Sequence, residues 1–124
     1  MARSHVRMHL CWVLLSAFIF SPLIRAQTDD LDKKKAEAAL AEYQKFASND
    51  NANVRRAAAE GLSLANHAIM VKPILAAMAA ETDEQVRESL AKALAAQSSK
   101  NAIIEQAHIL ESSSKPEERV AILQ

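Results

Sequence analysis

One helical pattern occurs twice in this 124-residue chain, at a constant offset of 32 in the numbering. It reads NANVRRAAAEGL at 51–62 and DEQVRESLAKAL at 83–94, so that Arg87 repeats Arg55, and we call this offset one period. Self-similarity at a period of this size is typical of stacked helical repeats. One such unit cannot bury its apolar face alone, and a stack of units forms a continuous core. The repeat therefore predicts an all-α fold.

Apolar residues follow Ala26 at spacings of three and four, which is the helical period. Pro73 removes a backbone donor, so the third helix either begins near Val71 or is kinked there. Two pairs, Thr82 with Gln85 and Ser114 with Glu117, have the spacing of a capping box. Helices are expected over about 29–48, 53–65, 70–80, 83–97, 101–111 and 116–123.

The two units resemble the short HEAT-like repeats of the kind first noted in phycobilisome lyases. The resemblance covers roughly 50–112 and rests on an acidic turn, a Val-Arg pair and an apolar stripe, namely Asp50, Val54, Arg55, Ala58 and Leu62, then Asp83, Val86, Arg87, Leu90 and Leu94. It implies a short right-handed α-solenoid of stacked antiparallel helix pairs, with about five to six helices. The last unit departs from the pattern, with ERV for VR and a turn expected to be two residues longer. An ordinary alanine-rich helical bundle is the alternative.

In arrays of this kind, the acid of the turn and the arginine commonly bond between adjacent units. By resemblance, Asp50, Arg55, Asp83 and Arg87 are expected to form such an inter-repeat ladder with a structural role. The alternative is a solvated pair of charges near the start of each helix.

The N-terminus has the features of a secretory signal peptide over residues 1–26. It begins with the basic residues Arg3 and Arg7, continues with the apolar run LCWVLLSAFIF at 10–20, and reaches Ala26, after which cleavage is expected. An uncleaved membrane anchor is the alternative, although a spanning helix needs about 20 apolar residues. The domain is expected over 27–124 and its location is secreted or periplasmic, or membrane-anchored if the segment is retained.

Cleavage would change the charge of the chain. Arg3, Arg7 and Arg25 would leave, so that 12 of the 15 basic residues would face all 15 acidic ones. A net charge of about −3 argues against nucleic acid, which needs a concentrated basic face. Cys11, the single cysteine, would also leave, and with it any disulfide or thiolate metal site.

The remaining residues carry no pattern that predicts an enzyme, a cofactor site or a metal site. His67 and His108 are far apart in the chain and have no ligand set at metal-binding spacing beside them. We therefore expect a non-enzymatic scaffold that binds a protein partner. Tyr43 and Arg56 are the candidate partner-surface residues, because Tyr and Arg are enriched at binding hot spots. Self-association is expected through the open C-terminal repeat at RVAILQ, and a membrane-anchored structural or assembly module is the alternative function.

Overall fold

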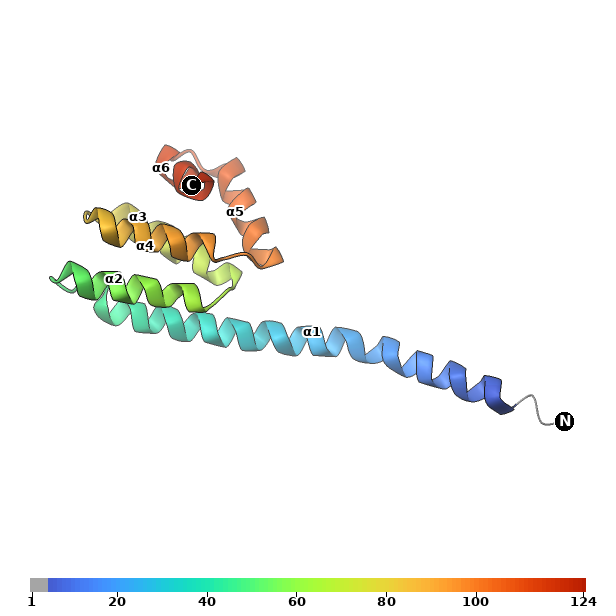
Figure 1. The fold of residues 1–124 in the computed structure, drawn as a ribbon. Helices are drawn as coiled ribbons and strands as arrows, with labels where there is room; N and C mark the ends of the chain where they lie inside the picture. The colour runs from blue at the N-terminus through green and yellow to red at the C-terminus, as the bar shows by residue number, and fades with distance from the viewer. Residues whose placement is uncertain (1–4) are drawn as a thin grey trace. The chain divides into compact units, whose positions relative to one another are not determined.

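The computed structural model describes the backbone of residues 5–124 and the side chains of residues 24–124. Within that part of the chain the fold is all-helical, as the periodicity predicts, and contains no strand (Figure 1). The α-helices are α1 (His5–Phe46), α2 (Ala52–Gly61), α3 (Val71–Ala80), α4 (Glu84–Ala95), α5 (Lys100–Ser112) and α6 (Pro116–Leu123). Two 3-10 turns, Leu62–Leu64 and Ala68–Met70, separate α2 from α3.

The chain divides into two compact units, Met1–Leu31 and Asp32–Gln124. The first contains the expected signal peptide at 1–26, which lies for the greater part outside the residues whose side chains are described. Among the described residues, no helix combines the length and apolar character needed to cross a membrane. The second unit contains the repeated stretches at 51–62 and 83–94.

The period extends further than the two matching stretches. The first residues of α2, α4 and α6 are Ala52, Glu84 and Pro116, so successive starts are one period apart. The connectors at 81–83 and 113–115 have the same length. The last turn is thus not two residues longer than its counterpart, contrary to the expectation. When the repeats are aligned by their helix starts, Arg119 of the ERV stretch lies one period after Arg87.

The helix caps differ from the two expected capping boxes. The N-cap of α4 is Asp83, directly after Thr82, and its carboxylate accepts hydrogen bonds from the backbone N–H groups of Gln85 and Val86. A carboxylate suits this position because it satisfies free amides and also faces the positive end of the helix dipole. At α6 the N-cap is Lys115, whose side chain makes no capping bond.

Helix α3 begins at Val71, which resolves the position of Pro73. A proline in the first turn is tolerated because the N–H groups there have no partner within the helix. The 3-10 turn at Ala68–Met70 leads into this start. The second helix ends at Gly61 and continues as a 3-10 turn, whereas the expectation extended it as a regular helix to 65.

The core of the second unit lies where α2 and α3 pack against α4. Its fully buried large side chains are Leu62, Met70, Val71, Ile74, Val86, Leu90 and Gln97. Ala36 of α1 is also fully buried, and Leu40 and Tyr43 pack against the same cluster. Helix α6 packs mainly on α5, with further contacts to α3 and α4. We call α1 from Asp32 onward with α2 the first pair, α3 with α4 the second pair, and α5 with α6 the third pair.

Candidate interaction surface

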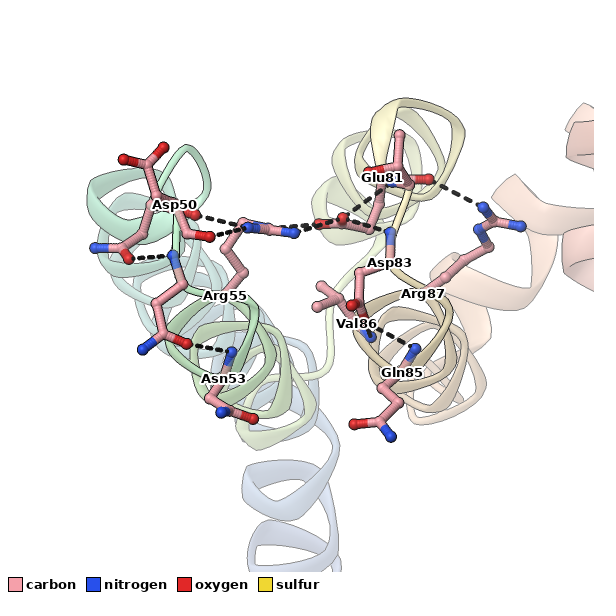
Figure 2. Close-up of polar contacts among 11 residues, drawn as sticks. Asp50, Asn53, Arg55, Glu81, Asp83, Gln85, Val86 and Arg87 are labelled. Carbon is pink, nitrogen blue, oxygen red and sulfur yellow. Dashed lines mark hydrogen bonds and ion pairs between the residues drawn. The ribbon is translucent and has the colours of Figure 1, made fainter.

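A bidentate ion pair connects the first and second pairs. Arg55 donates from Nε to Oε2 of Glu81 and from Nη2 to Oε1, both at 3.0 Å. The side chains are 16% and 8% exposed, so the pair is largely shielded from water. A bidentate arginine–carboxylate contact fixes geometry as well as contributing energy. Figure 2 shows Glu81 between the guanidinium groups of Arg55 and Arg87, which belong to successive units.

The Glu81 carboxylate also organises its own connector. Its Oε1 accepts hydrogen bonds from the backbone N–H groups of Thr82, at 3.0 Å, and Asp83, at 2.9 Å. The hydrogen bonds from Arg55, opposed by burial and aided by these amides, lower the pKa of Glu81 to about 2. Burial, followed by the negative charge of Glu81, raises the pKa of the nearby Tyr43 hydroxyl.

The four residues of the expected ladder all lie at this junction, but in other roles. Asp50 meets Arg55 through its backbone carbonyl oxygen, 3.3 Å from Nη1, and the carbonyl oxygen of Asn49 is closer, at 2.7 Å. Asp83 uses its carboxylate as the α4 cap. Arg87 donates from Nη2 to the backbone carbonyl oxygen of Glu81 at 3.1 Å.

Glu81 is the residue of this junction that the sequence does not predict. It is the first residue of the connector at 81–83. The repeat pattern points to Asp83 in this connector but not to Glu81. The signal that points to it is the register, because Glu81 stands one period after Asn49. Each of these two residues provides a carbonyl oxygen to the arginine at the start of the following helix.

One side-chain-to-amide hydrogen bond recurs in the three turns with different side chains. The backbone N–H of Asn51 donates to Oδ1 of Asn49, and that of Asp83 donates to Oε1 of Glu81, both at 2.9 Å. In the third copy, the N–H of Lys115 donates to Oγ of Ser113 at 3.1 Å. This side-chain hydrogen bond is therefore repeated at 49, 81 and 113, and of these three residues Glu81 carries the carboxylate that binds Arg55.

The two candidate surface residues have different surroundings. Arg56 donates from Nη1 to Oε1 of Gln85 at 3.1 Å, and its Nε lies 3.7 Å from Oε1 of Glu60, so it links α2 to α4 at the surface. Tyr43 is half-buried and lines a groove on the first pair.

This α1–α2 groove has a volume of about 820 Å³ and is predominantly apolar. Its α1 side is formed by Lys35, Ala38, Ala39, Glu42, Tyr43 and Phe46, and its α2 side by Asn53, Val54, Ala57, Ala58, Gly61, Leu64 and Ala65. Phe46 is 39% exposed and Leu64 is 88% exposed. Exposed apolar side chains gathered in one groove are typical of a surface for a protein partner.

The corresponding side chains of the second pair are covered. One period after Val54 and Ala58 stand Val86 and Leu90, both of which have no exposed surface. On the partner helix, Phe46 corresponds to Met78, which is 8% exposed. The covering element for this face of α4 is α2, which packs along it. The first pair thus leaves partly exposed the face that the second pair buries, since Val54 and Ala58 are half-buried.

The described side chains include no cluster of three or more His, Cys, Asp or Glu residues able to hold a metal ion. The Glu81 carboxylate links the start of α2 to two connector amides, and these donors occupy both of its oxygens.

No protein-family model, curated protein or solved structure matches this chain.

Proposed function

We propose that this chain is an exported, non-enzymatic scaffold of stacked helical repeats that binds an amphipathic helix of a protein partner in the α1–α2 groove. The observation that carries the proposal is the contrast between equivalent faces. The face of the second pair is covered by a helix, and the same face of the first pair is open and apolar.

The repeat architecture is supported by the spacing of the helix starts and by the side-chain-to-amide hydrogen bond that recurs at 49, 81 and 113. It is also supported by the packing of α2 along α4, since units of a solenoid contact their nearest neighbours. A right-handed solenoid with HEAT-like units is the form that we propose for this packing.

Binding in the groove is tested with a photo-crosslinking residue placed at Ala58, in cells that produce the protein. A matched probe replaces Glu88, which is exposed on α4 outside the groove. We expect one discrete protein adduct from the probe at 58, none from that at 88, and loss of the adduct in the Gly61→Trp background. Peptide mapping should place the crosslink on one face of a partner helix. Equal labelling from both probes would contradict the proposal.

Export is proposed from the basic start and the apolar run at 10–20. The intact mass of the protein recovered from producing cells distinguishes the two possibilities. A mature N-terminus at Gln27 agrees with export and cleavage. Retention of Met1 on the membrane fraction would instead favour the anchored assembly module.

A further inference from the structure

The first pair packs one of its faces on the second pair. The third pair exposes a surface made of the residues that correspond to that face in the repeat. We call the side chains that a pair turns toward the following pair its covering face. In the first pair these include Leu40 and Ala59, which belong to the same core cluster as the buried side chains of α3 and α4. Two periods further along the chain, the corresponding residues are Ile104 and Leu123.

Both side chains of the third pair are open to solvent. Ile104 is 55% exposed and Leu123 is 74% exposed, whereas Ala59 has no exposed surface. The molecule therefore has two complementary open surfaces, the α1–α2 groove and the covering face of the third pair. We propose that the covering face of one copy occupies the α1–α2 groove of a second copy, in a head-to-tail association that repeats the contact of the first pair with the second.

The sizes of the side chains fit this occupant. The floor of the groove has Ala58 and Gly61 where the second pair has Leu90 and Ala93, so it is deeper than its internal counterpart. A Cβ added at Gly61 would meet no atom within 4 Å, so the space at that point is open. The covering face of the third pair has a larger side chain than that of the first pair, because Leu123 stands where the first pair has Ala59. A larger side chain thus meets a deeper floor.

The charges change in a complementary way as well. In the groove, Glu42 stands where the second pair has the fully buried Ile74. On the covering face, Lys100 stands where the first pair has the fully buried Ala36. Both replacements are exposed, and they have opposite signs. Glu42 is paired with Lys45 of its own helix at 2.6 Å, and Lys35 also lines the groove, so Lys100 of the occupant would meet a carboxylate that already has one basic partner.

A head-to-tail contact joins two different surfaces of the same chain, so it can be blocked from either side and restored by mixing. This inference rests on the proposed function of the groove and names its occupant. The groove is filled with Gly61→Trp, and its control Gly61→Ala adds only a Cβ. The covering face is changed with Leu123→Glu. Its control Val120→Glu alters an exposed side chain of the same helix that lines the space beside α3.

The experiment is sedimentation velocity of the protein as recovered from producing cells, and of its variants, from about 10 µM to 1 mM, with circular dichroism to verify folding. We expect the average mass of the parent and of both controls to rise with concentration. Gly61→Trp and Leu123→Glu should each stay monomeric. Their equimolar mixture should form a one-to-one dimer and nothing larger, through the intact groove of one variant and the intact covering face of the other.

Three results would overturn the inference. These are a parent chain that stays monomeric at the highest concentration, self-association that survives in either blocking variant, and a mixture that stays monomeric. If the probe at position 58 gave a discrete adduct to another protein while the parent stayed monomeric, the proposed function would stand. The groove would then bind that protein instead of a second copy. Loss of both the adduct and the self-association would remove the proposed function itself.

Discussion

At the scale of single residues, Glu81 joins the first pair to the second. Its carboxylate binds the Arg55 guanidinium with two oxygens and two connector amides with one of them. Removing the carboxylate would take these hydrogen bonds from both amides and from Nε and Nη2 of Arg55, and unsatisfied polar groups are costly in a shielded site. One side chain thus links α2 to the connector before α4 and also binds two amides of that connector.

Replacement of Glu81 by alanine should therefore destabilise the fold. We expect a loss of about 2 kcal/mol in the free energy of unfolding, below the range for a fully buried ion pair because the site is partly open to water. Urea denaturation followed by circular dichroism measures this difference. The matched change Glu88→Ala removes an exposed carboxylate paired with Lys92 on α4 and should have little effect. Equal losses in the two variants would contradict the role assigned to Glu81.

The low pKa of Glu81 predicts a defined pH dependence. The pKa is about 2 in the folded protein against an ordinary value of 4.5, so the folded state binds fewer protons than the unfolded state. The stabilisation is complete above about pH 4.5 and is lost as the pH falls toward 2. The difference in unfolding free energy between the parent and Glu81→Gln should thus be constant above pH 5 and shrink between pH 4.5 and 2. A difference that stayed unchanged at pH 2.5 would exclude Glu81 as its source.

At the scale of elements, the start of α4 depends on Asp83 rather than Thr82. The Asp83 carboxylate accepts hydrogen bonds from two amides of the first turn, Gln85 at 3.0 Å and Val86 at 3.1 Å. Asp83→Ala should cost about 1 kcal/mol of stability, the usual value for a lost N-cap. Thr82→Ala removes the residue that the capping-box pattern favours and should leave the midpoint of urea denaturation nearly unchanged. The reverse order of the two variants would restore the sequence-based assignment.

At the scale of the whole molecule, the sequence predicts the features that depend on helical periodicity. It does not predict the side-chain contacts and exposed surfaces that depend on how distant segments pack. The helical spacing and the recurrence of Arg55 at Arg87 are sufficient for the all-α class and for the length of the repeating unit. The ion pair cannot be derived in the same way, because it depends on how far the Glu81 side chain extends from its turn. The groove escapes prediction for a related reason, since the exposure of Ala58 is decided by what covers it.

The third repeat shows how a register can be misjudged from letters alone. Matching the valine of VR to the valine of ERV moves the pattern by two places and suggests a longer turn. Counting from the helix starts places Arg119 at the same offset as Arg55 and Arg87. The polar turn at Ser113 then corresponds to those at Asn49 and Glu81, although the three side chains share no charge.

This register leads to a gain-of-function prediction for the association between copies. Within one chain, Arg55 of the covering helix pairs with Glu81 in the connector of the next pair. In the proposed head-to-tail contact, the covering helix brings Arg119, and the connector position is occupied by Asn49. Asn49→Glu should supply the missing carboxylate at a position whose side chain already accepts from the amide two residues later, as that of Glu81 does.

We expect Asn49→Glu to tighten self-association by about tenfold, which corresponds to about 1.4 kcal/mol for one new partly shielded ion pair. The change should disappear in the double variant Asn49→Glu with Arg119→Gln, and it should weaken as salt is raised from about 0.05 to 0.5 M, as expected from screening. Sedimentation equilibrium provides the association constants. Tightening that persists without Arg119 would place the new carboxylate against another cation, and unchanged association would mean that the connector at 49 lies outside the contact. The arginine at the start of each repeat would then act only within the chain, so this pair of substitutions tests whether the contact between copies follows the same rule as the contact between units.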